Sequence, residues 1–123
     1  INNFNGDVIM INEAILKINP NAQFVVRGND LATCEIEWHN CSPIPKEQIE
    51  ALFPIVEFEM ALDELRAKRN KALTDSDWTQ LPDVGFNAAE RNAWMIYRQS
   101  LRDITNNIET AEQAKSISFP VKP

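Results

Sequence analysis

The sequence is poor in glycine and cysteine and lacks long apolar runs, and each shortage excludes a class of protein. Three Gly among 123 residues argue against loops that wrap a phosphate group and against a barrel with many tight turns. Two Cys are too few for a disulfide framework and suit a reducing compartment better than a secreted one. No apolar run is long enough to cross a bilayer, and no basic-then-apolar leader is visible. Ile1 in place of Met is compatible with a piece of a longer chain.

Basic charge is also scarce, and the patterns of common enzymes are missing. The chain carries 18 acidic and 12 basic residues, a formal charge of −6, so its surface repels phosphate backbones. P-loop, G-x-S-x-G and H-E-x-x-H patterns are absent, and the single histidine, His39, has no fixed nucleophile for a triad. An acid–base pair of Asp77 and Asp83 has no His, Lys or Gly beside it. We therefore predict a protein that is not an enzyme, with no catalytic residues and no cofactor, and with no nucleic-acid, membrane or small-molecule partner.

Cys34, His39 and Cys41 raise the alternative of a zinc site, such as that of a zinc-dependent hydrolase, because thiolates and imidazole are preferred zinc ligands. Their spacing is C-x4-H-x-C, without a fourth ligand nearby. Strand alternation places Cys34 and His39 on opposite faces. We interpret Cys34 as a core residue, His39 as a surface residue and Cys41 as a loop residue, and we expect no bound metal.

Residues 1–53 predict a small α/β module. Apolar residues at helical spacing in 10–19 indicate a helix that ends near Ile18, because Pro20 follows. Residues 23–39 alternate between apolar and polar side chains, with turn residues at 28–30, and predict a β-hairpin. The first helix is expected to cover one face of it, since a lone two-stranded hairpin is only marginally stable. Pro45 lies near the start of a short second helix.

Residues 54–110 predict an antiparallel helical hairpin. Pro54 marks the boundary, and the run 55–74 has an apolar stripe narrow enough for helix-on-helix packing, formed by Ile55, Phe58, Leu62, Leu65 and Ala72. The second helix should begin at the capping-box pattern Asn87-Ala-Ala-Glu90. Its stripe is long and rich in aromatics, with Trp94, Tyr97, Leu101, Ile104 and Ile108. The pattern fades after about Thr110, and 111–123 is expected to be an extended, Pro-containing tail. The predicted fold class is α+β.

The connection between these helices contains Ser76-Asp-Trp-Thr-Gln-Leu-Pro-Asp83 and is longer than most helix–helix links. We predict a capping loop in which Trp78 and Leu81 fold back over the end of the hairpin. Polar residues 75–77 should satisfy backbone donors where the first helix ends. Arg98 and Asp103 are expected to pair with the loop carboxylates and so lock the loop.

Two segments carry motifs of a known kind. Residues 76–83 read Ser-Asp-Trp-Thr-Gln-Leu-Pro-Asp after an Arg-rich helix, and 94–103 read Trp-x-x-Tyr-Arg-Gln-x-Leu-Arg-Asp. With the ending Phe119-Pro-Val-Lys-Pro123, these motifs make the chain from about residue 60 onward resemble the phage tail assembly chaperone family, although the tail is abbreviated and lacks the family's usual Trp. Residues 14–51, with their Asn-Pro-Asn-Ala turn and Ile-x-Trp strand, are similar to a small module of phage tail-region proteins.

The resemblance implies a chaperone that binds a phage tail-fibre or other tail protein in the host cytoplasm during assembly, by contact alone. The alternative is a structural tail, baseplate or fibre-associated component that stays in the virion. The narrow seam of the first helix also permits a homo-oligomer. The partner-binding or motif residues that we expect are Trp78, Leu81, Pro82, Asp83, Trp94, Tyr97, Arg98, Leu101, Arg102 and Phe119.

Overall fold

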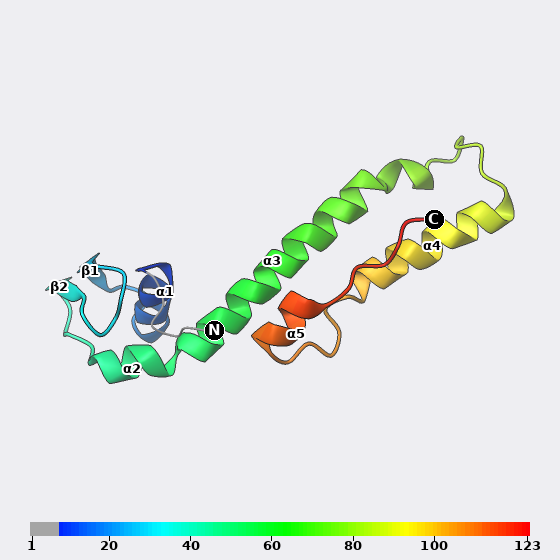
Figure 1. Ribbon diagram of the computed structural model, residues 1–123. Helices are drawn as coiled ribbons and strands as arrows, with labels where there is room; N and C mark the ends of the chain where they lie inside the picture. The colour runs from blue at the N-terminus through cyan, green and yellow to red at the C-terminus, as the bar shows by residue number, and fades with distance from the viewer. Residues whose placement is uncertain (1–7) are drawn as a thin grey trace. The chain divides into compact units, whose positions relative to one another are not determined.

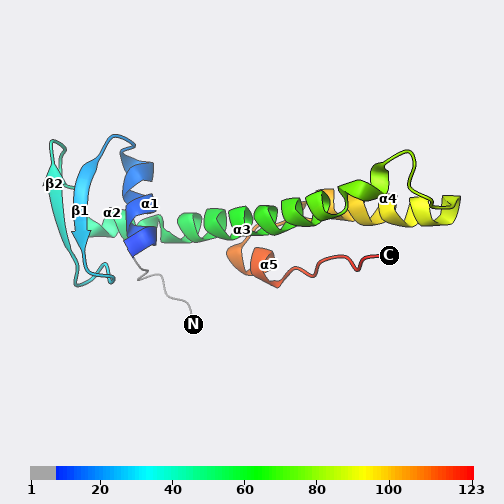
Figure 2. The same ribbon diagram turned by 90° about the horizontal axis from the view of Figure 1, so that it is seen from above.

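The computed structural model describes residues 8–123 and divides into two compact units, residues 1–57 and 58–123. Figures 1 and 2 show the elements of both units. Over residues 8–123 there are five α-helices and one two-stranded antiparallel sheet, so the fold class is α+β, as predicted. Within the same range, no helix is long and apolar enough to cross a membrane.

Unit 1 begins with helix α1 (Val8–Ile18), which ends where the sequence predicts. Pro20 cannot continue the helix, and the backbone amide of Ala22 donates to the carbonyl of Asn19 at 3.0 Å to close the expected turn. Strand β1 (Gln23–Arg27) follows. In both views α1 lies beside β1 (Figures 1 and 2), so the predicted cover of the hairpin by the first helix is confirmed.

The hairpin pairs β1 with β2 (Glu35–His39). Phe24 lies opposite Trp38, with the ring centroids 5.8 Å apart. Side chains alternate between exposed and half-buried along both strands, which confirms the predicted one-sided burial. The turn depends on Gly28, because its φ of 113° is in the left-handed region, and a Cβ there would lie 3.3 Å from Cys34 Cα.

One apolar cluster forms the core of unit 1. It combines the inner face of α1 with the short helix α2 (Lys46–Ala51) and the first turns of helix α3 (Phe53–Asp75), and the hairpin packs against it. Its buried members are Ile11, Ala14, Ile15, Leu31, Cys34, Ile49, Phe53 and Val56. Cys34 is thus a core residue, as expected from strand alternation.

The start of α3 corrects two predictions. The helix begins at Phe53, one residue before the predicted boundary at Pro54, and Pro54 lies in its first turn, where a helix tolerates proline because the missing amide would have no partner. The predicted stripe is also out of phase at this end, since Val56 is buried while Ile55 is 47% exposed. Phe53 and Val56, three residues apart, enter the unit 1 core and fix the rotation of the helix there.

Unit 2 contains the rest of α3, the 3-10 turn Asp77–Gln80, helix α4 (Ala88–Arg102) and helix α5 (Ala111–Ser116). After the loop, α4 runs back in the direction opposite to α3 (Figure 1). The predicted capping box is present, because Asn87 Oδ1 accepts from the Glu90 amide and Glu90 Oε1 accepts from the Asn87 amide, both at 2.8 Å. A buried cluster of Ala61, Leu65, Ile104 and Ala114 joins α3 to α5 and to the segment before it.

The second half of unit 2 differs from the prediction in two ways. α4 ends at Arg102, and the chain turns through 103–107, with Asn107 at a φ of 64°. Ile104 and Ile108 therefore pack from a turn and not from a continuous helical stripe. The expected extended tail is also partly helical, because Thr110 caps α5 by accepting from the Gln113 amide at 3.1 Å. Only 117–123 is extended.

Candidate binding site at the loop between α3 and α4

A single guanidinium fixes the loop that follows α3. Arg98 Nη1 donates to the Leu73 carbonyl at 2.9 Å and to Ser76 Oγ at 2.7 Å. Its Nη2 pairs with Asp77 Oδ1 at 2.9 Å. The Arg98 side chain is only 13% exposed, so these bonds are shielded more than an ordinary surface pair, and the planar fork holds three groups at once. We call this set of contacts the Arg98 lock.

Two buried hydroxyls complete the lock from inside the loop. Ser76 and Thr79 are 3% and 2% exposed. Ser76 Oγ donates to the Leu73 carbonyl at 3.1 Å, and Thr79 Oγ1 donates to the Ser76 carbonyl at 2.7 Å. The prediction that residues 75–77 satisfy backbone donors is therefore wrong, because a helix end leaves carbonyls, not amides, without partners. Asp75 instead pairs with Lys71 at 2.9 Å.

The predicted pairing of α4 with the loop carboxylates is correct for Arg98 and wrong for Asp103. Asp103 Oδ1 accepts from Gln99 Nε2 at 3.0 Å, within the end of α4. Charge explains why Arg98 pairs with the loop and Asp103 does not, because the negative carboxylate of Asp103 is repelled by the negative carboxylates of the loop.

Four aromatic rings connect the loop to α4, and we call them the aromatic cluster (Trp78, Phe86, Trp94 and Tyr97). Trp78 lies 5.7 Å from Phe86 and 5.9 Å from Trp94, measured between ring centroids. Phe86 stacks on Trp94 at 6.4 Å, and Trp94 meets Tyr97 edge-on at 5.6 Å. Aromatic pairs in such arrangements contribute stabilising free energy in addition to that from the apolar area they bury. Tyr97 is buried and Trp78 is 51% exposed, so the cluster leads from the interior to the surface.

The other expected site residues fall into three environments. Leu81 is 53% exposed, and Pro82 and Asp83 are exposed in the turn beside it. Leu101 is fully buried, while Arg102 is exposed with one bond to Gln99.

Phe119 belongs to a different part of unit 2. It is half-buried against the cluster that contains Leu65 and Ala114, and not against the aromatic cluster. The structure thus brings together Trp78, Trp94, Tyr97 and Arg98, and it leaves Phe119 elsewhere.

Sequence reasoning missed Phe86, Ser76 and Thr79 as parts of the site. Phe86 immediately precedes the capping box, a position from which it reaches back to Trp78. The hydroxyls of Ser76 and Thr79 are three residues apart, the spacing at which a side chain reaches the preceding turn. The position of Phe86 beside the capping box and the three-residue spacing of the two hydroxyls were the signals in the sequence that could have identified these residues.

Several charged residues elsewhere form exposed ion pairs. Arg27 hydrogen-bonds Glu37 at 2.7 Å and holds the pKa of that carboxyl below its usual value, and Asp75 raises the pKa of Lys71. Among residues 8–123, no group of three His, Cys, Asp or Glu side chains is arranged to hold a metal ion. Cys41 is half-buried, and its thiol donates to the Gln23 carbonyl at 3.4 Å.

The Arg98 lock, the aromatic cluster and α5 all lie within the part of the chain that matches a known family. The family is described as phage tail assembly chaperone protein, and it matches residues 62–123. This chain therefore belongs to the phage tail assembly chaperone family, and its role is in tail assembly. Comparisons with curated proteins and with solved structures gave no match.

Proposed function

We propose that this protein binds a phage tail-fibre or other tail protein during assembly through the loop between α3 and α4. The observation that carries the proposal is the exposure of Trp78, at 51%, on a loop that the Arg98 lock fixes. Exposed tryptophan is typical of residues that dominate binding energy. A loop that is already ordered loses little conformational entropy when it binds.

The residues of the site take different roles in this proposal. Trp78 and Leu81 contact the partner directly, because both are about half exposed, at 51% and 53%. Trp94 and Tyr97 support Trp78 from α4. Pro82 stiffens the turn. Asp83 and Arg102 are exposed polar residues, and in this proposal their charges contribute to partner selection more than to affinity.

The mechanism is contact without catalysis. Trp78 and Leu81 cover an apolar part of the tail protein in the host cytoplasm until that part is incorporated into the tail. In the free chaperone the Trp94 ring packs against the Trp78 ring and covers part of it. The cycle uses no nucleotide or cofactor.

The test is co-expression of this chain with the tail-fibre protein of the same phage. The wild-type chain should keep the fibre protein in the soluble fraction and co-purify with it. Trp78→Ala should weaken binding by more than tenfold, since truncating a central aromatic anchor typically costs about 2 kcal/mol or more. Val25→Ala is the matched control, because Val25 is 42% exposed on β1, outside the family match. A Trp78→Ala chain that binds as tightly as the wild type contradicts the proposal.

A second candidate function is a subunit that remains in the virion. The extended segment 117–123 favours it, because Val121 is 90% exposed there, as in an arm that becomes ordered on a partner. Mass spectrometry of purified particles separates the two functions. Peptides at the copy number of the fibre or baseplate indicate a permanent subunit, and their absence indicates a released chaperone.

A further inference from the structure

Residues 119–123 have the pattern of a ligand for an aromatic surface, and we call them the proline segment. They read Phe-Pro-Val-Lys-Pro, so Pro120 and Pro123 are three residues apart. Proline fixes its own φ near −65° and disfavours helix for the residue before it. The segment therefore favours a polyproline II helix, in which residues three apart lie on one face. Segments of this kind bind surfaces that are lined with aromatic side chains.

The proline segment also carries a basic side chain that has no partner. All 12 basic residues of the chain lie within residues 8–123. In that range every other basic residue has an interaction partner, whereas Lys122 has neither a hydrogen bond nor an ion pair. Val121, the residue before it, is 90% exposed. The end of the segment thus presents an apolar side chain and an uncompensated positive charge.

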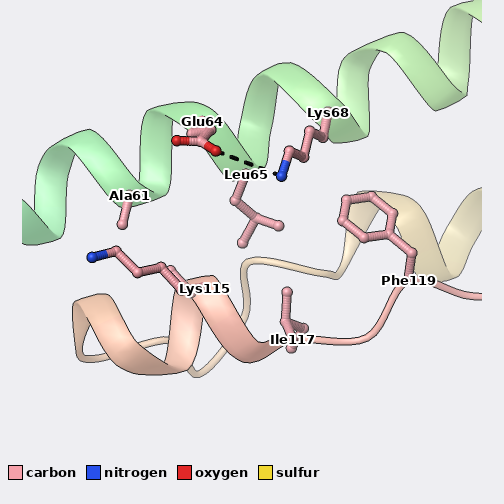
Figure 3. A pocket seen from close by; sticks show the side chains of 8 residues that line it. Ala61, Glu64, Leu65, Lys68, Lys115, Ile117 and Phe119 are labelled. Atoms are coloured by element: carbon pink, nitrogen blue, oxygen red, sulfur yellow. Dashed lines mark ion pairs between the residues drawn. The ribbon is translucent and has the colours of Figure 1, made fainter. Parts of the chain in front are cut away.

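The start of the proline segment is held on unit 2, and its end is not. Phe119 and Pro120 are half-buried. Phe119 packs against the cluster that contains Leu65, and in Figure 3 its ring lies beside α3, near Lys68. With Phe119 in this place, Lys122 pairs with no carboxylate among residues 8–123. While Phe119 stays packed, a partner for the end of the segment must therefore come from another molecule.

The loop between α3 and α4 has the groups that complement this segment. Trp78 is 51% exposed, and its ring lies 5.7 Å from that of Phe86, measured between centroids. Asp83 lies between these two residues in the sequence, in a turn that the Val84 amide closes by donating to the Leu81 carbonyl at 3.3 Å. The Asp83 side chain is exposed and has no partner within the described part of the chain. The loop thus offers aromatic rings and an unpaired negative charge.

We propose that this loop binds the proline segment of a second copy of the chain. The prolines of one copy contact the Trp78 and Phe86 rings of the other, and Lys122 pairs with Asp83. Each copy has one proline segment and one loop, so a reciprocal exchange closes as a two-fold symmetric dimer. This contact goes beyond the proposed function, because it occupies the loop when no tail protein is present. A tail protein that binds Trp78 would displace it.

The first experiment titrates a blocked peptide with the sequence of residues 118–123 into the full chain, labelled with 15N for NMR. The indole N–H signals of Trp78 and Trp94 should shift, and that of Trp38 should not. The expected Kd is about 0.1–1 mM, as is reasonable for a short peptide with few contacts. A peptide with both prolines replaced by Ala should bind several-fold more weakly. Equal affinity of the two peptides, or a shift of the Trp38 signal alone, overturns the proposal.

The second experiment measures self-association of the full chain by sedimentation velocity at a series of concentrations. Lys122→Gln and Asp83→Asn should each raise the dimer Kd about two- to fivefold or more, the range for an exposed ion pair. The chain with Lys122→Asp and Asp83→Lys together should recover part of the loss from either reversal alone. Glu112→Gln is the matched control, since Glu112 is also exposed and unpaired within residues 8–123. A wild-type chain that stays monomeric while it binds the peptide overturns the proposal.

The proposed function and this contact can fail separately. Lys122→Gln should still keep the tail-fibre protein in the soluble fraction, because Trp78 and Leu81 are intact. Trp78→Ala should lose both self-association and the tail protein. If Trp78→Ala loses only the tail protein, the exchange between copies is overturned and the proposed function stands. If it loses only self-association, the exchange is supported and the proposed function is contradicted.

Discussion

Each of the two units of this protein is stabilised internally by a different kind of interaction. Unit 1 is built around one apolar cluster, in which Ile11, Ile15 and Phe53 are fully buried. Unit 2 has a cluster of smaller residues, and its loop end is fixed by the hydrogen bonds of Arg98. Apolar burial stabilises a fold but removes side chains from the surface. A hydrogen-bonded lock orders a loop while Trp78 stays about half exposed, and this suits the unit that matches the tail assembly chaperone family.

The comparison predicts the largest loss of stability in the core of unit 1. Phe53→Ala should lower the free energy of unfolding by about 3–5 kcal/mol, because it removes a fully buried ring and leaves a cavity. Urea denaturation followed by far-UV circular dichroism measures this loss. Ile55→Ala is the control on the same helix, since Ile55 is 47% exposed, and it should change the stability by about 0.5 kcal/mol at most. Similar effects of the two variants would mean that the unit 1 core does not depend on Phe53.

The Arg98 lock should give an intermediate effect. Arg98→Ala removes the donor that serves Leu73, Ser76 and Asp77 and should cost about 1.5–3 kcal/mol, the range for hydrogen bonds to charged groups. Thermal unfolding measures it. Arg98→Lys keeps the charge without the fork, so it should recover only part of the loss.

Arg102 provides the control for the lock. It lies one turn further along α4, is exposed and donates to Gln99 Oε1 at 3.3 Å. Arg102→Ala should therefore leave the stability within about 0.5 kcal/mol of the wild type. If Arg98→Ala is as mild as Arg102→Ala, the loop is ordered by the aromatic cluster alone.

The smallest effect should be the pH dependence of the hairpin in unit 1. Arg27 lowers the pKa of Glu37 in the folded state. The pair therefore contributes stability above the usual carboxyl pKa and loses it as the pH falls through the lowered value. Glu37→Gln should be slightly less stable than the wild type at neutral pH, and the difference should vanish in acid. Thermal unfolding at a series of pH values measures it, and a difference that persists in acid would assign the effect to packing instead.

The elements with strong local signals could be predicted from the sequence. Pro20 ends α1, the alternation around Trp38 marks β2, and Asn87 with Glu90 marks the start of α4. Each of these depends on neighbours within a few residues. The pairing of Arg98 with the loop was also predictable, because Arg98 is on the helix that follows the loop and the loop carries carboxylates with which a guanidinium can pair.

The prediction failed where a tertiary contact or a short signal decided the structure. Val56 rather than Ile55 is buried because the core of unit 1 reaches into α3, which no local pattern indicates. The start of α5 had a signal in Thr110 and Gln113, the spacing of a capping box, but the helix has only 6 residues. The rotation of Trp78 onto Phe86 and Trp94 depends on the whole loop, so the sequence indicated part of this residue set but neither Phe86 nor the geometry.

The contact between Trp78 and Trp94 also makes the protein its own optical reporter. The chain has three Trp residues, and these two indoles lie 5.9 Å apart with their planes inclined by 63°. Transitions of rings so close and so inclined couple, and their coupling gives a signal in near-UV circular dichroism. Trp38, in unit 1, can be replaced by Phe to leave only this pair. A protein that docks over Trp78 would then change the signal without any attached label.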